Sequence, residues 1–206
     1  MQRILIIGAG GQGAVVADIL GDAVVASIED HEPFPPHDAV LVAIGDNRAR
    51  RAITERLGDE QHATAIHPFT SIARTATIGA GTMISAGAIV APRAILGRGV
   101  LLNTKASVDH DTVVGDFAHI APGATIGGRC RIGDDAFIGP GATIASGVSI
   151  GARTVVGAGS VVLRDLPDDV TAFGVPARVG VEQNAFSPPT RGDDEGPPAG
   201  RHGRQR

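Results

Sequence analysis

Aliphatic residues recur at every sixth position through the middle of this 206-residue chain. The repeat begins at Ile72 and ends at Val162, and none of its sixteen positions is skipped or displaced by an insertion. A period of six fits neither an α-helix nor a strand that alternates between two faces. It is typical of a parallel β-helix, in which each hexapeptide forms a short strand and a corner. The repeat therefore predicts that this part of the chain folds as a solenoid.

A second periodic feature supports this interpretation, because the residue four places after each aliphatic position is usually small. In a β-helix the aliphatic side chain fills the interior and the small one fits the narrow inner edge. Gly often follows the aliphatic residue directly, where we expect it to relieve the backbone at the corner. Cys130 occupies one of the small positions, and we interpret it as a packed thiol rather than a catalytic one.

The residues before the repeats have the pattern of a small α/β unit. Segment 3–20 has the pattern of a buried strand, a glycine turn and a helix, and further strands are predicted within 23–30 and 37–45. A second helix is predicted over 46–58. Strands that alternate with helices in this way predict a small parallel sheet.

These patterns divide the chain into three segments. We expect a Rossmann-like α/β domain over residues 1–65 and a β-helix domain over 66–181. Residues 182–206 are rich in Pro, Gly and charges of both signs and contain few residues that could form a core. Such a composition predicts a disordered tail.

Composition and charge narrow the classes of partner. A formal net charge of −4 gives no electrostatic reason to expect binding to nucleic acid or to an anionic membrane. The chain has one Cys and only a short apolar run near its start, so we expect a cytoplasmic protein without an internal disulfide. With no Trp and no Tyr, a sugar ligand would be held by polar groups and the backbone rather than by aromatic stacking.

A glycine-rich motif joins the first predicted strand to the first predicted helix. Gly8, Gly10 and Gly13 form G-x-G-x-x-G, and Asp30 follows at the end of the second strand, where it could meet a ribose hydroxyl. The N–H groups at the start of such a helix attract a phosphate. Residues 1–65 make only about half of a complete dinucleotide fold, so we expect a nucleoside diphosphate rather than NAD. The motif could instead be a tight turn that only packs the helix on the strand.

An unusually polar cluster interrupts the repeats at Asp109, His110 and Asp111. His110 stands at a corner position, and three hexapeptides per coil would place Gly128 one coil above it, at about 4.8 Å. An imidazole beside a glycine N–H is an arrangement that acyl transfer would use, and either aspartate could hold one ring nitrogen. The alternative is that these residues only cover a solvated corner.

In these motifs the chain resembles the hexapeptide-repeat acyltransferases, in particular the branch with a small nucleotide-binding unit before the repeats. That branch comprises bacterial nucleotide-amino-sugar N-acetyltransferases and the related sialic acid O-acetyltransferases. The resemblance extends from about residue 3 to residue 178. The matching stretches are "IIGAGGQG", "AIGDN", "AIHP", "LLNT", "VDHDTVVGDFAHIAPGA", "VGAGS" and "FGVPAR".

The resemblance implies a left-handed β-helix and a homotrimer that binds acetyl-CoA between neighbouring helices, with active sites between subunits. It implies that His110 is the general base, that Asp111 orients it and that Asn103 supports the catalytic site. His119 would line the coenzyme or acetyl position, together with Gly157 on the coenzyme. The Gly128 N–H would meet the thioester oxygen.

The resemblance also assigns the nucleotide sugar to the glycine loop, which here consists of Gly8, Gly10, Gly11, Gln12 and Gly13 and is completed by Asp30. Two positions depart from the family pattern. The amino-sugar enzymes commonly have His where this chain has Gln12, and many have Glu where it has Asp111. Because the hydroxyl-acetylating branch often has His-Asp, the acceptor atom stays open at this point.

We therefore expect an acetyltransferase that moves acetyl from acetyl-CoA to the amino group of a nucleotide-linked 4-amino sugar, without a metal ion. The alternative is O-acetylation of a sialic acid-type or other sugar hydroxyl. A metal-dependent lyase on the same fold would need three histidine ligands, whereas the repeats contain only His110 and His119. A purely structural solenoid would not need the glycine loop or the polar cluster.

Overall fold

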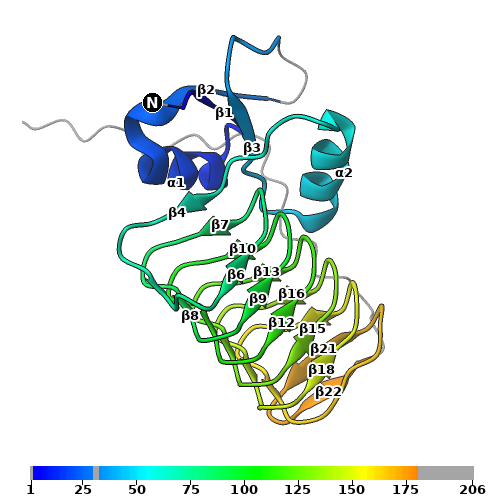
Figure 1. The fold of residues 1–206 in the computed structure, drawn as a ribbon. Coiled ribbons are helices and arrows are strands. Elements are labelled where there is room, and N and C mark those ends of the chain that lie inside the picture. The colour runs from blue at the N-terminus through cyan, green and yellow to red at the C-terminus, as the bar shows by residue number, and fades with distance from the viewer. Residues whose placement is uncertain (1, 30–32, 181–206) are drawn as a thin grey trace, which may run out of the picture.

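A small α/β unit caps one end of a three-sided β-helix in the computed structural model, which describes residues 2–29 and 33–180 (Figure 1). The predicted tail over 182–206 and the candidate ribose ligand Asp30 lie outside the described residues. The α/β unit contains β1 (Ile4–Ile7), α1 (Gly11–Leu20), the 3₁₀ turn η1 (Gly21–Ala23), β2 (Val24–Ile28), β3 (Ala39–Val42) and α2 (Asn47–Leu57).

The α/β unit has the predicted order of elements. Its three strands are parallel and follow the order β2-β1-β3, so the first strand lies at the centre. All four residues of β1 and of β3 are buried, as expected of strands that are covered on both faces. Asp46 caps α2 by accepting a hydrogen bond from the Ala49 N–H at 2.8 Å.

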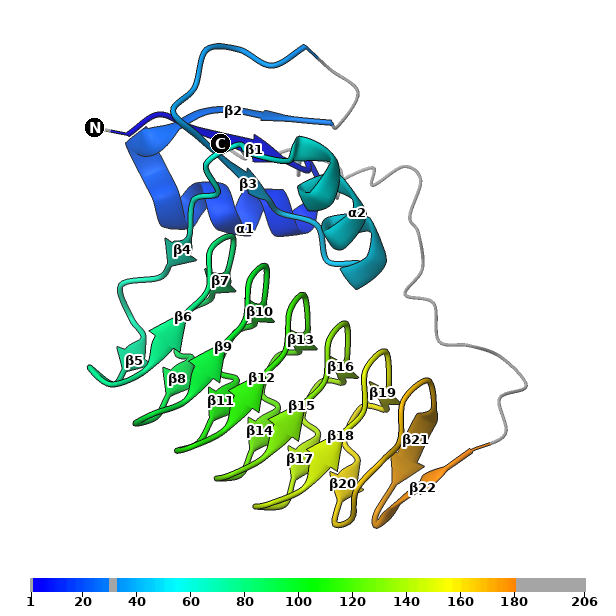
Figure 2. The ribbon, with the colours of Figure 1, turned by 45° about the vertical axis from the view of Figure 1, so that its right-hand side comes forward.

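The hexapeptides form the coils of the β-helix, which Figure 2 shows as a regular stack. Each of the sixteen predicted aliphatic positions ends one of the two-residue strands β5–β20, so the predicted register is confirmed. The strands are β4 (Ala65–Ile66), β5 (Ser71–Ile72), β6 (Thr77–Ile78), β7 (Met83–Ile84), β8 (Ile89–Val90), β9 (Ile95–Leu96), β10 (Leu101–Leu102), β11 (Ser107–Val108), β12 (Val113–Val114), β13 (His119–Ile120), β14 (Thr125–Ile126), β15 (Arg131–Ile132), β16 (Phe137–Ile138), β17 (Thr143–Ile144), β18 (Ser149–Ile150), β19 (Val155–Val156), β20 (Val161–Val162), β21 (Thr171–Gly174) and β22 (Ala177–Val179).

The strands of the β-helix form three faces, and within each face the strands of successive coils are parallel. Residues eighteen apart stack on successive coils, as in the pairing of Leu101 with His119. One face contains β4, β7, β10, β13, β16, β19 and β21, extended by the antiparallel strand β22. A second contains β5, β8, β11, β14, β17 and β20, and a third contains β6, β9, β12, β15 and β18. We call them the first, second and third face. The interior is a continuous column of aliphatic and small side chains in which Cys130 is fully buried.

The glycines that directly follow an aliphatic residue have a different role from the predicted one. A Cβ at Gly97 would lie 2.5 Å from Asp116 Oδ1 on the next coil, so this position is restricted by the close approach of coils. The left-handed backbone conformation occurs two residues later, at Gly99 (φ 61°) and at its stacked equivalent Phe117 (φ 57°). The corner therefore bends at a position where the chain uses Gly, Arg, Asp, Lys or Phe.

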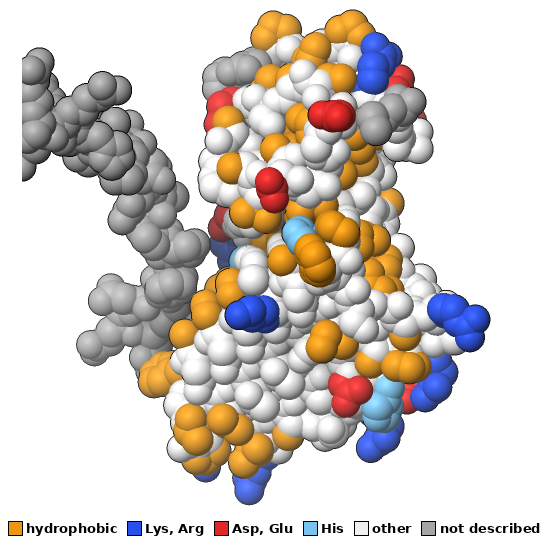
Figure 3. All heavy atoms as spheres, turned by 90° about the vertical axis from the view of Figure 1, so that its left-hand side faces the viewer, with side chains coloured by type: hydrophobic (Ala, Val, Ile, Leu, Met, Phe, Trp, Pro, Cys, Tyr) orange, Lys and Arg blue, Asp and Glu red, His pale blue; other side chains and the backbone are white. Residues whose placement is uncertain are grey.

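The α/β unit sits on the upper part of the first face. Apolar residues of β1, α1 and β3 form one core with Ala65, Met83 and Leu101, which point outward from the helix. Ala65 and Ile66 together form β4, so the expected domain boundary falls within this strand. The charged side chains in the view of Figure 3 are scattered and leave much of the β-helix face uncharged. No helix of the described part of the chain is long and apolar enough to cross a membrane.

Helix α2 is attached to the β-helix through a buried arginine. The guanidinium of Arg50 donates to the carbonyl oxygens of Gly99 (2.8 Å) and Phe117 (2.7 Å) on two successive coils. It also donates to the carbonyl oxygen of Ile44 at 2.8 Å and to Asn47 Oδ1 at 2.9 Å. Burial lowers the pKa of Arg50 to about 10, so the side chain is still charged at neutral pH. These bonds place the β3–α2 loop against the corner where the third and first faces meet.

Candidate active site

His110 lies on the corner between β11 and β12, where the second and third faces meet. Its imidazole lies over Gly128 on the next coil, because a Cβ at position 128 would stand 2.8 Å from Nε2 and 2.9 Å from Cε1. The predicted juxtaposition of these two residues is therefore confirmed. Only glycine at position 128 leaves room for the ring in this position.

The imidazole of His110 is oriented by Asp111. Oδ2 of Asp111 lies 2.7 Å from Nδ1 of His110, which leaves Nε2 as the nitrogen without a partner among the described residues. Asp109 has another role, since its Oδ1 accepts a hydrogen bond from the His110 backbone N–H at 2.7 Å. Of the two aspartates that the sequence left open, Asp111 is the one that holds the ring.

Arg93, which the sequence reasoning missed, holds the carboxylate of Asp111 from the preceding coil. Its Nε donates to Oδ1 at 2.6 Å and its NH2 group to Oδ2 at 2.8 Å. The hydrogen bonds from Arg93 and then from His110 hold the pKa of Asp111 well below its usual range, so this carboxylate is ionised. The sequence does contain the signal, because Arg93 precedes Asp111 by one eighteen-residue coil.

The Gly128 backbone supplies a second polar group to this corner. The Gly128 N–H donates no hydrogen bond to any described residue, although the adjacent Arg129 N–H donates to the His110 carbonyl oxygen at 2.9 Å. A backbone N–H without a partner beside an imidazole can stabilise a negatively charged oxygen.

His119 and Asn103 lie together on another side of the molecule. His119 belongs to β13 on the first face, and its Nε2 lies 3.2 Å from Asn103 Nδ2. The Phe137 ring packs edge-on against the imidazole with centroids 5.1 Å apart. Burial, with a further contribution from the charge of Arg50, lowers the pKa of His119 to about 3. His119 is therefore neutral at physiological pH, and its Nε2 accepts the hydrogen bond from the Asn103 amide.

The glycine loop combines the two roles that the sequence left open. Gly8 (φ 117°) and Gly13 serve packing, since a Cβ at Gly8 would lie 2.7 Å from the Ala43 carbonyl oxygen and one at Gly13 would collide with the Gly8 carbonyl. Gly10 and Gly11 have open space where a Cβ would stand, so a ligand could approach their backbone closely.

The remaining predicted loop and coenzyme residues are placed as follows. The Gln12 amide Nε2 lies 3.9 Å from the Met83 sulfur, so this side chain reaches from α1 toward the first face. Gly157 lies on the corner that follows β19, and its N–H already donates to the Ala172 carbonyl oxygen at 2.8 Å. A Cβ there would stand 2.9 Å from the Cβ of Phe173, which is a packing restriction.

The predicted residues do not converge within one chain. His110, Asp111 and Gly128 lie on the corner between the second and third faces, which is the corner opposite the first face. Asn103 and His119 lie on the first face or at its edge, below the unit that carries the glycine loop. The body of the β-helix separates these two groups.

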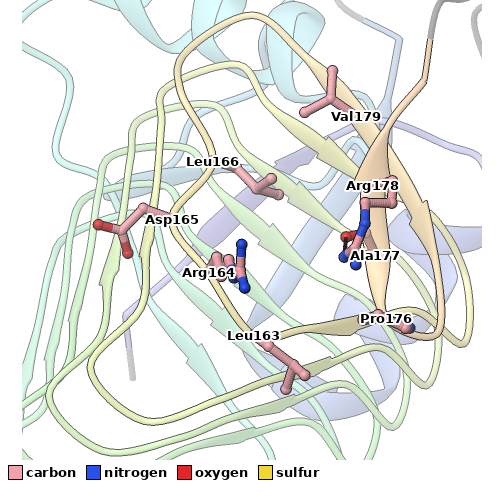
Figure 4. A pocket seen from close by; sticks show the side chains of 8 residues that line it. All are labelled: Leu163, Arg164, Asp165, Leu166, Pro176, Ala177, Arg178 and Val179. Atoms are coloured by element: carbon pink, nitrogen blue, oxygen red, sulfur yellow. Dashed lines mark hydrogen bonds between the residues drawn. The ribbon is translucent and has the colours of Figure 1, made fainter.

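The surface of the described residues has two hollows, and neither is lined by the predicted site residues. One, of about 410 Å³, is formed by the C-terminal hairpin and the coil before it, and Figure 4 shows the side chains that line it. Its lining contains two cations, Arg164 and Arg178, and one carboxylate, Asp165. Arg164 stands at the same corner position as His110, three coils farther on. The second hollow, of about 310 Å³, lies between α2 and the β-helix and is lined partly by His62 and Arg98. The described part of the chain contains no group of three His, Cys, Asp or Glu side chains placed to hold a metal ion.

Comparison with known proteins reveals relatives of the same architecture. Residues 129–164 match the family described as bacterial transferase hexapeptide (six repeats). The chain is 34% identical over 113 residues to UDP-N-acetylbacillosamine N-acetyltransferase of Bacillus subtilis, a match that covers 42% of this chain. The match spans about half of that curated relative, 52% of its length.

Two solved structures are similar over almost their whole length. The acetyltransferase domain of PglB from Neisseria gonorrhoeae shares 32% identity and a TM-score of 0.81, covering 87% of this chain and 100% of that one. PerB from Caulobacter crescentus, solved in complex with CoA and GDP-perosamine, shares 34% identity and a TM-score of 0.82, covering 88% of this chain and 98% of that one. The protein therefore belongs to the hexapeptide-repeat acetyltransferase family that includes PglB and PerB, as the resemblance in its sequence predicted.

Proposed function

We propose that this protein transfers the acetyl group of acetyl-CoA to the amino group of a nucleotide-linked 4-amino sugar, with His110 as the general base. The observation that carries the proposal is the corner where the ring of His110, held by Asp111 at 2.7 Å, lies over Gly128. Two relatives support this acceptor class. The Bacillus subtilis enzyme is named for an amino-sugar substrate, and PerB was solved with GDP-perosamine bound.

The chemistry follows from the orientation of the ring. Because Nδ1 is occupied by Asp111, Nε2 can take the proton that the amine loses as its nitrogen attacks the thioester carbonyl. The C–N bond forms, the carbonyl oxygen becomes negative and the Gly128 N–H stabilises it. When the C–S bond breaks, the CoA thiolate leaves, and the proton held by His110 can pass to it or to water. General base catalysis of this kind contributes typically 10²–10⁴-fold.

Acetyl-CoA would lie along the corner that carries His110. Three coil steps from His110 to Arg164 correspond to about 14 Å, a length suited to an extended pantetheine arm. The hollow at Arg164 and Arg178 then offers two cations to the phosphates of the coenzyme (Figure 4). A PglB structure solved in complex with acetyl coenzyme A and the PerB complex with CoA support the choice of donor.

The nucleotide sugar would bind on the α/β unit. The N-terminus of α1 and the open backbone at Gly10 and Gly11 suit a diphosphate, and Gln12 reaches from there toward the first face. Asn103 and His119 lie farther along that face, where the sugar would reach. His119, kept neutral by burial, offers a polar but uncharged surface to the sugar or the acetyl group.

A homotrimer brings the two groups together. His110 lies on the corner opposite the first face, whereas Asn103 bonds His119 on that face, so a site that uses all three residues would form between two copies. Three copies arranged around an axis would place the His110 corner of each against the first face of the next, and would repeat the site three times. The interface would then include part of the proposed active site.

The test is CoA release from acetyl-CoA with UDP-, dTDP- and GDP-linked 4-amino sugars and with the matching 4-hydroxy sugars. We expect turnover of an amino sugar, and we expect His110→Gln to slow that turnover by about 10²–10⁴-fold while it still binds acetyl-CoA. The control His62→Gln removes an imidazole from the hollow under α2 and should leave turnover unchanged. Turnover of hydroxy sugars alone would move the assignment to O-acetylation, and normal turnover in His110→Gln would refute the assigned base.

A further inference from the structure

We propose that Arg93 is a positioning residue for the reaction, acting through Asp111 to fix the orientation and the charge environment of the His110 imidazole. The inference rests on the proposed function, because it concerns the base of that reaction. It starts from the continuous chain of contacts from Arg93 through the Asp111 carboxylate to His110 Nδ1.

Both oxygens of the Asp111 carboxylate are held by hydrogen bonds. One oxygen, Oδ2, bonds both the NH2 group of Arg93 at 2.8 Å and Nδ1 of His110 at 2.7 Å, and the other bonds Nε of Arg93 at 2.6 Å. A guanidinium that binds both oxygens fixes the plane of the carboxylate, which a single bond would leave free to turn. With that plane fixed, Oδ2 keeps one direction toward Nδ1, and the His110 ring keeps Nε2 free for the substrate.

The exposure of the pair argues against a role in stability alone. The Arg93 side chain is 63% exposed, and exposed ion pairs contribute little to folding. Arg93 also precedes His110 by a coil, whereas the proposed coenzyme path runs along the later coils toward Arg164. We therefore expect the loss of Arg93 to affect the base rather than the binding of acetyl-CoA.

The charge of Arg93 also affects the His110 ring. Four charged side chains belong to the corner around the ring: Arg93 below, Asp111 beside it, Asp109 bonded to the His110 N–H, and Arg129 on the coil above. Arg93 offsets the negative charge of Asp111 and so opposes protonation of the ring. Without Arg93 the ring would take up a proton more readily, and the base would be lost at a higher pH.

The first experiment is the pH profile of kcat/KM for Arg93→Gln. We expect kcat to fall about 10-fold through misorientation of the base, with the KM for acetyl-CoA changed less than about twofold. The acid limb should move to higher pH. Arg93→Lys keeps the positive charge but cannot bind both carboxylate oxygens as the planar guanidinium does. It should therefore restore the acid limb to its wild-type position and recover part of kcat.

The chain contains a matched control at Arg153, which binds both oxygens of Asp169 at 2.6 Å between coils on a different corner. Arg153→Gln breaks the same kind of pair without a histidine beside it, so kcat and the pH profile should both stay at wild type. An Arg93→Gln profile that matches wild type, or equal effects in the two variants, would overturn the inference.

A second measurement does not depend on turnover, so it separates this inference from the proposed function. The ¹⁵N NMR signals of the His110 ring, assigned by their loss in His110→Gln, report which ring nitrogen carries the proton. In wild type we expect the Nδ1–H form, and in Arg93→Gln a mixture of the two neutral forms. If no sugar were acetylated but the ring changed in this way, the proposed substrate would fall and the positioning role would stand. An unchanged ring signal in Arg93→Gln would overturn the role.

Discussion

A single imidazole, that of His119, shows how burial sets the charge of a side chain in this protein. His119 lies against Phe137 and Asn103 beneath the α/β unit, and the buried, positively charged Arg50 lies near it. Burial and that charge both disfavour the imidazolium and lower the pKa of His119 to about 3. In the unfolded chain the same ring would titrate at about 6.5.

This difference predicts a specific loss of stability in acid. The pKa of His119 is lower in the folded protein than in the unfolded chain. Its contribution to the free energy of unfolding is therefore complete above about pH 6.5 and is lost as the pH falls toward 3. Between pH 7.5 and pH 5 this residue should lower the free energy of unfolding by about 2 kcal/mol. Urea unfolding at the two pH values should show a smaller difference in His119→Gln than in wild type. An unchanged difference would show that His119 is protonated in the folded protein.

At the scale of elements, the attachment of α2 depends on one arginine. Arg50 is fully buried and faces carbonyl oxygens rather than a carboxylate, so its bonds join the helix to two coils of the solenoid. The helical period predicts α2 itself, but it does not indicate which of the four arginines between Asn47 and Leu57 turns inward. That choice depends on where the corners of the β-helix present their carbonyl groups.

Replacing Arg50 with Met should loosen this attachment. The carbonyl oxygens of Gly99, Phe117 and Ile44 would lose their donor while they stay buried, which we expect to lower the free energy of unfolding by about 2–4 kcal/mol. Arg48→Met on the exposed side of the same helix should cost less than about 0.5 kcal/mol. Urea unfolding of both variants checks this. Equal effects would show that the bonds of Arg50 contribute nothing beyond helix propensity.

At the scale of the whole molecule, the proposed site is divided between opposite sides of the β-helix. This division leads to a test by subunit mixing. His110→Gln and Asn103→Ala should each lower activity alone, whereas trimers refolded from an equal mixture should recover about a quarter of wild-type activity. In each mixed trimer one of the three interfaces would combine an intact His110 with an intact Asn103. Recovery of no activity, with mixed trimers confirmed by native mass spectrometry, would contradict a site shared between subunits.

Much of the architecture follows from short-range features of the sequence. The period of six defines every strand from β5 to β20, because each coil must place an aliphatic side chain in the same narrow interior. The order of elements in the α/β unit follows from local hydrophobic patterns and the glycine turn. The position of Gly128 over His110 also follows, since three equal hexapeptides return the chain to the same corner.

The stacking step of eighteen residues applies in both directions along the chain. Arg93 therefore lies beneath Asp111 for the same reason that Gly128 lies above His110. The spacing alone brings these residues to one corner, but it does not determine which side chains bond there. That depends on rotamers, such as the one that directs the Arg93 guanidinium to both oxygens of Asp111 rather than into solvent.

Only the tertiary structure decided how the groups of residues are distributed in space. It placed His110 and His119 on opposite sides of the solenoid, although they are nine residues apart in sequence. It also seated the α/β unit over Met83 and Leu101, and turned Arg50 inward. These features depend on which faces the α/β unit and the β-helix bury against each other. The local hydrophobic period is the same on all three faces of a β-helix, so it cannot distinguish between them.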